Sequence, residues 1–499
     1  MLSLHCLTRY CAAILLTSPL ARGQATPIID LGYAQYQGAV DTLSNITQFL
    51  GIRYAAPPIG DLRFRAPHAP VKTAELQLAM AQPNDVYYPS DGTGVPPVDL
   101  PTVVFIHGGG YVAGAASEFS GEDLVQQSNR GIVVVLIQYR LGIFGFLAGS
   151  AVKKNGALNA GLLDQDFALR WVNRHISKFG GDPSKVTIWG QSAGAGSVLQ
   201  HLVANGGRTK PQLFRAAITS STFLPSQYHF DDRVPELLFG EVLAQTNCTT
   251  ATDSMACLRA ADGTVFEAVN TNITSSAFFG TFVLVPVIDD TFIVQRPTIS
   301  LMEGKVNGAA LLVVTNTFEG THFVNQKVAV TASQYSLDLF PGFGTAQADA
   351  VGSLYADLGS DLFQVNAVQG ESIFICPTYY LLSAFRGRAF KAEFAILPGL
   401  HANDIVYYFP GTSTPPFNNT IFIDAFAQSF TSFIINLDPN LKVDPSTITP
   451  QWNMFEIEHT EMLFNKTADG VPVVQPITTS DALLNRCRFW NSVGNLTAQ

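Results

Sequence analysis

The chain has 499 residues, of which 47% are hydrophobic and only 14% are charged. This composition excludes a disordered protein, which needs solvating charge, and a nucleic-acid-binding protein, which needs a basic surface. With 29 basic and 39 acidic side chains the net charge is -10, so the protein's own field opposes binding to a phosphate backbone. The length alone allows about three average domains.

The first 23 residues have the pattern of a secretory signal peptide. Arg9 precedes a short apolar stretch, and the small residues Ala21 and Gly23 stand where a signal peptidase cleaves. A membrane anchor is the weaker alternative, because the stretch is far below the ~20 residues that span a bilayer. We therefore expect an exported mature chain, residues 24–499, without a stable membrane span.

Six Asn-X-Ser/Thr triplets are spread along the mature chain, which also keeps four cysteines. Both features agree with export, since N-glycans and disulfides form in the secretory compartment. We expect glycans on several of these asparagines, namely Asn45, Asn247, Asn272, Asn418, Asn465 and Asn495.

Apolar runs typical of buried parallel strands alternate with helical patterns along the chain. A helix is predicted over 164–179, where apolar side chains recur at helical spacing before Gly180 and Pro183. The apolar run 131–149 is interrupted by polar residues and indicates a buried strand and a turn. Neither an internal repeat nor a low-complexity linker occurs, which favours one large domain. Strands are predicted at 102–106, 132–137, 186–189, 309–314 and 389–394.

One serine stands in the context of a nucleophile elbow. The motif Gly190-Gln191-Ser192-Ala193-Gly194 follows a predicted strand and precedes small apolar residues that suit a helix. Glycines are needed there because the strand and the helix converge on a strained turn, where a Cβ would collide. Ser192 is therefore the candidate nucleophile.

A glycine-rich motif, His107-Gly108-Gly109-Gly110, directly follows the predicted strand 102–106. Bare glycine backbone lets N–H groups approach a substrate closely, as stabilisation of a developing oxyanion requires. In lipases and esterases one more N–H comes from the residue after the nucleophile. That residue is Ala193.

A general base and an acid are expected downstream of the serine. His401 lies in a loop after the strand 389–394, and Glu319 lies after the strand that ends near residue 314. The order Ser192, Glu319, His401 is the order of nucleophile, acid and base in α/β-hydrolases.

Other side chains compete for these roles. Asp289 and Asp290 are alternative acids, although the stretch around them is typical of a turn. For the remaining histidines a surface or core position is expected: His68, His175, His201, His229, His322 and His459.

Further blocks resemble the type B carboxylesterase/lipase family, which includes fungal lipases, carboxylesterases and cholinesterases. They span most of the chain and include Phe49-Leu50-Gly51-Ile52-Arg53-Tyr54-Ala55, Tyr139-Arg140-Leu141-Gly142, Leu163-Asp164-Gln165 and Phe179-Gly180-Gly181-Asp182-Pro183. The resemblance implies an α/β-hydrolase fold, in which helices cover both faces of a mostly parallel sheet. It also implies a serine ester hydrolase that needs no metal or cofactor.

The resemblance assigns residues to roles. It places the triad on Ser192, Glu319 and His401, and it places the oxyanion donors on Gly109, Gly110 and Ala193. It further implies the disulfides Cys248–Cys257 and Cys376–Cys487. The expected substrate is a small-molecule or lipid ester. The alternatives are a lipase or sterol-ester hydrolase for long acyl chains, and a catalytically impaired or non-catalytic member such as an adhesion protein.

The largest departure from the family lies between Pro67 and Val103. Relatives carry there a cysteine-closed loop, which is the lid in yeast lipases and part of the gorge wall in cholinesterases, followed by a Glu-Asp-Cys-Leu block. This chain has neither, so choline-ester specificity and lid-gated activation are not expected. A skipped exon in the gene prediction is the alternative explanation. If the loop is absent, we expect Arg63 or Arg65 to lack a carboxylate partner.

Two smaller departures lie beside the predicted triad. Gln191 stands where relatives usually have Glu, which keeps hydrogen bonding but removes a negative charge next to the ester. Asp404 carries its carboxylate on a shorter stem than the usual Glu, and both a structural and a catalytic role stay open for it.

Overall fold

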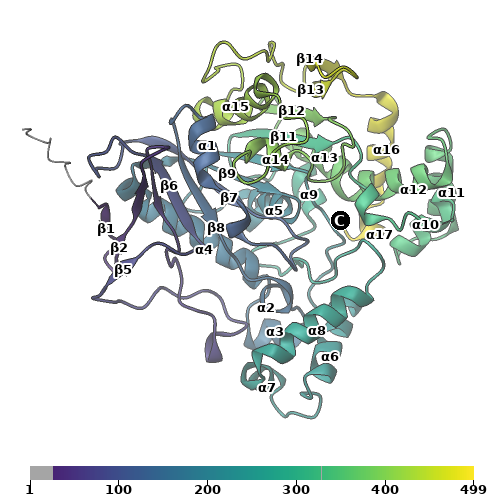
Figure 1. The fold of residues 1–499 in the computed structure, drawn as a ribbon. Coiled ribbons are helices and arrows are strands. Elements are labelled where there is room, and N and C mark those ends of the chain that lie inside the picture. The colour runs from purple at the N-terminus through teal and green to yellow at the C-terminus, as the bar shows by residue number, and fades with distance from the viewer. Residues whose placement is uncertain (1–25, 328) are drawn as a thin grey trace, which may run out of the picture.

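An eleven-stranded sheet runs through the protein (Figure 1). The computed structural model describes residues 26–327 and 329–499, so the predicted signal segment lies outside the described residues. The strand order is β14-β13-β12-β11-β10-β9-β7-β8-β6-β4-β3. Its strands are β3 (Ala39–Asp41), β4 (Ile46–Phe49), β6 (Asp85–Pro89), β7 (Leu100–Ile106), β8 (Val133–Ile137), β9 (Gly181–Gln191), β10 (Ala216–Ser220), β11 (Ala310–Asn316), β12 (Ala389–Phe394), β13 (Thr460–Lys466) and β14 (Pro472–Thr478).

The central strands, from β8 through β13, are parallel to one another. Antiparallel strands flank them, with β6, β4 and β3 on one side and β14 on the other. A second sheet contains β1 (Ile28–Asp30), β2 (Gln35–Gln37) and β5 (Leu76–Leu78). Parallel strands need crossover connections, and these carry most of the helices.

The sheet is buried on both faces, as β7 shows. Val104 and Ile106 pack into one apolar cluster with Leu169 of α4 (Ala160–His175) and Val198 of α5 (Ala193–Gly207). The alternate residue Phe105 packs into a second cluster, which contains the phenylalanines of α15 (Thr420–Asn436). Successive side chains of a strand point to opposite faces, so helices cover both faces, and the predicted α/β-hydrolase architecture is confirmed.

The longer helices surround this sheet (Figure 1). They are α1 (Gly121–Gln127), α4 (Ala160–His175), α5 (Ala193–Gly207), α6 (Arg233–Gln245), α7 (Ser254–Ala260), α8 (Gly263–Ser276), α10 (Ala332–Leu339), α11 (Thr345–Tyr355), α12 (Asp361–Gly370), α13 (Cys376–Ala384), α15 (Thr420–Asn436) and α16 (Asp481–Ser492). Shorter helices are α2 (Gly142–Phe146), α3 (Ser150–Asn155), α9 (Pro297–Met302), α14 (Ile405–Tyr408) and α17 (Gly494–Thr497). Among residues 26–327 and 329–499, no helix is long and apolar enough to cross a bilayer.

The predicted helix 164–179 and the predicted turn in the run 131–149 differ in detail from the elements in the structure. Helix α4 begins at Ala160 rather than at 164, directly after Asn159, whose φ of +52° turns the chain. The first turn buries Leu162 and brings Gly161 against Phe146, where a Cβ would lie 2.6 Å from the ring. The run 131–149 contains β8 as predicted, but the expected turn includes the short helix α2.

The segment between Pro67 and Val103 contains β5 and β6 and enters β7. Strand β6 lies in the main sheet, between β4 and β8. The sequence predicts that Arg63 or Arg65 lacks a carboxylate partner. Among the described residues, neither arginine forms an ion pair. Arg63 instead donates to the carbonyl oxygen of Ala261 at 2.6 Å and lies over the Phe266 ring.

Both disulfides implied by the resemblance are present. Cys248 is bonded to Cys257, nine residues away, and closes a small loop between α6 and α7. Cys376 at the start of α13 is bonded to Cys487 in α16, which is 111 residues away.

Candidate active site

Ser192 sits on the strained turn between β9 and α5. Its φ is +55° and its ψ is -122°, a combination that residues with a side chain rarely adopt. A Cβ on Gly190 would lie 2.2 Å from the carbonyl carbon of Gly194, and one on Gly194 would lie 2.0 Å from the carbonyl oxygen of Ile106. The glycines are therefore required by close backbone contacts, as the elbow pattern predicts.

Ser192, His401 and Glu319 form one hydrogen-bonded chain. His401 Nε2 lies 2.9 Å from Ser192 Oγ, and His401 Nδ1 lies 2.6 Å from Glu319 Oε2. The side chain of Glu319 is fully buried and that of His401 is 8% exposed. The three residues follow β9, β11 and β12, and the carboxyl ends of parallel strands meet at one edge of the sheet. That edge brings them together.

Two neutral donors hold the Glu319 carboxylate. The hydroxyl of Ser221 and the backbone N–H of Asn316 each donate to Oε1 at 2.7 Å, which leaves Oε2 for His401. The rings of Phe323 and Phe374 lie 5.0 and 4.5 Å from the imidazole, between ring centres. The carboxylate and the imidazole are thus fixed in a largely dry site.

Asp404 is a second buried carboxyl group near Glu319. Its Oδ1 accepts a hydrogen bond from Asn316 Nδ2 at 3.0 Å, and its Oδ2 accepts one from Tyr408 at 3.2 Å. Burial, and to a smaller extent the charge of Glu319, raises the pKa of Asp404 to about 6. In the described part of the chain it makes no hydrogen bond to Ser192 or His401, so it supports the site through Asn316.

The loop after β7 presents unpaired backbone N–H groups beside Ser192. Gly109 and Gly110 have φ values of +106° and +61°, and within the described residues neither donates a backbone hydrogen bond. Ala193 is the first residue of α5, where the N–H has no partner inside the helix. Among the described residues, the three predicted oxyanion donors therefore have backbone N–H groups without a backbone partner.

An apolar cavity of about 220 Å³ adjoins this loop. Phe282 lines the cavity and also lies against Gly110, where a Cβ would come within 2.1 Å of its ring. Phe146 and Phe223 line it too, and both pack on Tyr111 in the loop. The cavity is therefore linked to the glycine-rich loop through these aromatic side chains, and none of Ser192, Glu319 and His401 lines it.

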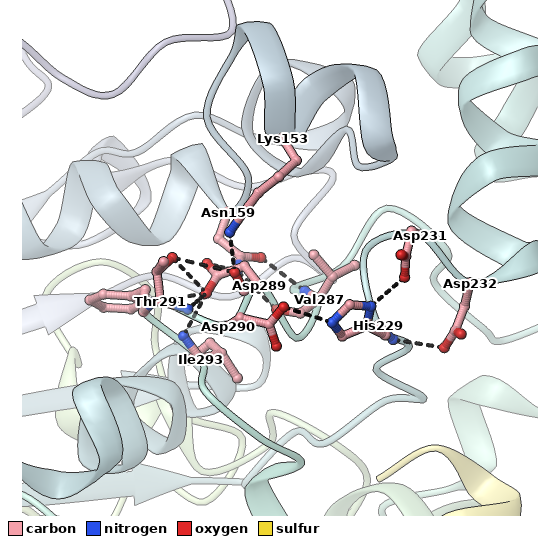
Figure 2. A network of polar contacts seen from close by, with 11 residues as sticks. Lys153, Asn159, His229, Asp231, Asp232, Val287, Asp289, Asp290, Thr291 and Ile293 are labelled. Atoms are coloured by element: carbon pink, nitrogen blue, oxygen red, sulfur yellow. Dashed lines mark hydrogen bonds and ion pairs between the residues drawn. The ribbon is translucent and has the colours of Figure 1, made fainter.

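The rival acids belong to a different network, which Figure 2 shows. Oδ1 of Asp289 accepts hydrogen bonds from the backbone N–H groups of residues 291–293, and its Oδ2 accepts one from Asn159 at 2.7 Å. Asp290 pairs with His229 at 2.9 Å. Their carboxylates stabilise the loop that precedes α9 (Pro297–Met302), so Glu319 is the acid beside His401.

The remaining sequence predictions fall mainly at the surface. Five asparagines of the predicted glycosylation motifs are exposed or partly exposed, and the sixth, Asn465, is half-buried in β13. The amide of Gln191 lies 3.4 Å from His401 Nε2, so this departure from the family directly neighbours the base.

Sequence reasoning missed Ser221 and Asn316, which hold Glu319. Ser221 follows β10, a strand that was not predicted from the sequence although Ala216-Ala217-Ile218-Thr219 precedes it. The available signal was a polar run, Ser220-Ser221-Thr222, at the end of an apolar stretch.

Comparisons with known proteins agree with this geometry. The profile of the carboxylesterase family matches residues 25–85 and 84–339. Carboxylesterase patB of Aspergillus clavatus is 28% identical over 570 aligned residues, covering 97% of this chain and 99% of that protein. Lipase 4 of Diutina rugosa is 30% identical over 474 residues, covering 79% and 84%.

Solved structures show the same fold. The crystal structure of Aspergillus niger EstA has a TM-score of 0.85 at 29% identity and covers 95% of this chain and 99% of that one. A PNB esterase structure has a TM-score of 0.75 at 23% identity, covering 91% and 97%. The profile matches two stretches that meet at residues 84–85, between Pro67 and Val103. The chain belongs to the carboxylesterase family and is a carboxylic ester hydrolase.

Proposed function

We propose that this protein is a secreted serine esterase that works through an acyl-enzyme on Ser192. The observation that carries the proposal is the unbroken chain of hydrogen bonds from Ser192 Oγ through His401 to Glu319, at 2.9 and 2.6 Å. An intact chain of this kind also argues against the non-catalytic and the impaired alternatives.

In the first half-reaction Ser192 Oγ attacks the ester carbonyl carbon and gives its proton to His401 Nε2. The imidazolium then donates this proton to the leaving alcohol, which leaves the acyl group on Ser192. Water attacks the acyl-enzyme in the second half-reaction, with His401 again taking and returning a proton. Glu319 orients the imidazole and stabilises the imidazolium.

The oxyanion of each tetrahedral intermediate is proposed to bind the N–H groups of Gly109, Gly110 and Ala193. Donors fixed before the reaction stabilise the developing charge without reorganisation, and one of them is worth on the order of 10² to 10³ in kcat. No metal or cofactor is part of this mechanism.

The substrate is proposed to be an ester with an apolar acyl or alcohol group. The adjoining cavity is lined mainly by aromatic and aliphatic side chains, and Gln191 adds no charge that would favour a cationic alcohol. Long acyl chains are the second candidate, because Lipase 4 of Diutina rugosa is among the relatives. A series of p-nitrophenyl esters from acetate to palmitate separates the two by the chain length at which kcat/KM is highest.

Export and domain structure complete the proposal. Residues 24–499 form a single α/β-hydrolase domain without the lid or gorge loop, and its exposed sequons carry N-glycans. The two disulfides suit an oxidising compartment. A gel mobility of the secreted protein that glycosidase treatment leaves unchanged would contradict the glycans.

The decisive experiment labels Ser192 with a fluorophosphonate. We expect one label per folded wild-type chain, located on Ser192, and no label on Ser192→Ala. Turnover of p-nitrophenyl acetate should fall to background in the same variant. A folded wild-type protein that takes up no label would identify the impaired alternative, and substantial turnover by Ser192→Ala would refute the assigned nucleophile.

A further inference from the structure

The side chain of His107 controls the peptide that carries the Gly109 donor. His107 Nδ1 lies 2.8 Å from the carbonyl oxygen of Gly108. That carbonyl and the N–H of Gly109 belong to the same planar trans peptide and point in opposite directions. A hydrogen bond from the imidazole to the Gly108 oxygen therefore fixes the direction of the Gly109 N–H.

This hydrogen bond exists only in one form of the neutral imidazole. Burial lowers the pKa of His107 to about 4, although the hydrogen bond to Gly108 acts in the opposite direction. The ring is therefore neutral at pH 7 and has one N–H. This proton must be on Nδ1, because the Gly108 carbonyl oxygen can only accept a hydrogen bond. Nε2 then has no proton and must accept a hydrogen bond from another group.

Gln138 supplies the donor that Nε2 requires. Its Nε2 lies 3.1 Å from His107 Nε2. The amide cannot be reversed, because its Oε1 accepts from the backbone N–H of Ala116 at 3.0 Å and its Nε2 also faces the carbonyl oxygen of Tyr139 at 3.2 Å. The orientation of the Gln138 amide thus dictates which nitrogen of His107 is protonated.

The backbone of Gln138 is itself held in place directly after β8. Its N–H donates to Asn84 Oδ1 at 2.8 Å, and its carbonyl accepts from Tyr54 at 2.7 Å. The Tyr139 ring stacks on His107 at 4.5 Å, and the Tyr139 hydroxyl donates to the His107 carbonyl at 2.8 Å. The imidazole therefore has little freedom to rotate away from Gly108.

We propose that Gln138 is a positioning residue of the oxyanion hole, which selects the tautomer of His107 and thereby aims the Gly109 N–H at the substrate oxyanion. The proposal rests on the proposed function, because it assumes that Gly109 binds the oxyanion. It assigns a part in the reaction to a side chain that touches neither the substrate nor the triad.

Replacement of Gln138 by Glu tests the tautomer directly. The new carboxylate can only accept, so it favours a proton on Nε2. The carboxylate also raises the pKa of His107, because a nearby negative charge favours the imidazolium. Near pH 5 the imidazolium has protons on both nitrogens and keeps its bond to Gly108. At higher pH the single remaining proton lies on Nε2, and two lone pairs then face each other at Gly108.

The titratable groups around His107 are few. Tyr139 stacks on it, and His401 lies beyond Gln191, whose side-chain oxygen lies close to Gly108. Burial and the Gly108 carbonyl are the causes of the shifted His107 pKa, and no charged residue contributes. A new alkaline loss of activity in Gln138→Glu would therefore report on the introduced carboxylate and His107.

We expect kcat of Gln138→Glu to be close to wild type near pH 5 and about 10- to 100-fold lower near pH 8, since one oxyanion donor is worth on the order of 10² to 10³. KM should change much less, because the interaction is made mainly in the transition state. The isosteric variant Gln138→Met removes the donor without adding charge. It should lower kcat by a smaller factor that is the same at every pH, because the Gly108 carbonyl still favours a proton on Nδ1, and it serves if the Glu variant does not fold.

The matched control is Gln165→Glu, which places a new carboxylate beside another buried imidazole. Gln165 Oε1 lies 3.0 Å from Nε2 of His201, whose pKa burial also lowers to about 4. His201 lies in α5 and makes no hydrogen bond to the loop of Gly108 in the described chain. We expect Gln165→Glu to lack the alkaline loss of kcat.

Fluorophosphonate titration keeps the outcomes distinct. If wild-type protein is not labelled on Ser192, the proposed function fails. If wild-type protein is labelled and both folded Gln138 variants keep wild-type kcat across pH 5 to 8, the positioning role of Gln138 is refuted. The same holds if Gln165→Glu loses activity at alkaline pH as Gln138→Glu does.

Discussion

The buried Asp404 carboxyl group makes folding stability depend on pH in a direction opposite to most carboxylates. Burial is the main cause that raises its pKa from the usual 3.8 to about 6. Between these two values the folded protein keeps the proton, whereas the unfolded chain has lost it. Stability rises with pH only where the unfolded state binds more protons, so the contribution of Asp404 decreases as the pH rises through this window.

The size of the effect follows from the same two values. A tenfold change in proton affinity is worth about 1.4 kcal/mol, so a pKa raised to about 6 corresponds to about 3 kcal/mol over the whole window. Replacement of Asp404 by Asn removes the titration but keeps an oxygen for Asn316 and a polar group for Tyr408. The stability of Asp404→Asn relative to wild type should therefore increase by about 2 kcal/mol between pH 4 and pH 7.5, a range that spans most of the window. This means that the free energy of unfolding of the variant, minus that of the wild type, is larger at pH 7.5.

Urea unfolding of both proteins at the two pH values measures this difference. Any loss of hydrogen bonding in the variant is present at both pH values, so it cancels in the comparison. The pH dependence of titratable groups that do not interact with residue 404 cancels as well, and burial rather than the neighbouring charges is the main cause of the Asp404 shift.

Two results would refute the reasoning. One is a difference between variant and wild type that is the same at pH 4 and pH 7.5, and the other is a variant whose relative stability falls as the pH rises. Activity should survive the change, because Asp404 reaches Glu319 only through Asn316.

Two further predictions concern the support of Glu319 and the disulfides. Ser221→Ala should lower kcat for p-nitrophenyl acetate about 10-fold, since a hydrogen bond to a charged group is worth about 1.5–3 kcal/mol and Asn316 keeps its own bond; an unchanged kcat would contradict this role. Replacing both Cys376 and Cys487 by Ser should cost about 2 kcal/mol more, in urea unfolding, than the same change at Cys248 and Cys257, because in the loop-entropy model the longer loop restricts the unfolded chain more. Equal losses would contradict the model for this protein.

The candidate triad could be located from the sequence because each member lies in the turn or loop that follows a strand. Ser192, Glu319 and His401 come after β9, β11 and β12, and the glycine-rich loop comes after β7. In a parallel sheet these ends share one edge, so the order of motifs along the chain was sufficient to bring them together. The fold class followed from the same alternation of apolar strands and helices.

The supporting residues could not be predicted, because they depend on the order of strands across the sheet. Strand β10 lies between β9 and β11, and this is what brings Ser221 to Glu319. Strand β8 lies beside β7, and this brings Gln138 to His107. Neither neighbour relation is visible in the spacing of residues along the chain, and a single Ser or Gln carries no motif of its own.

The segment before β6 is connected to the candidate site through Asn84. Asn84 ends this segment, and its carbonyl accepts hydrogen bonds from Gly51 and Ile52 at 3.1 and 2.9 Å. Its side chain holds the N–H of Gln138 at 2.8 Å. The end of the segment therefore anchors Gln138 directly, and β6 follows it in the sheet beside β8. The position of Gln138 beside His107 thus depends on Asn84 at the end of the segment rather than on the residues that precede it.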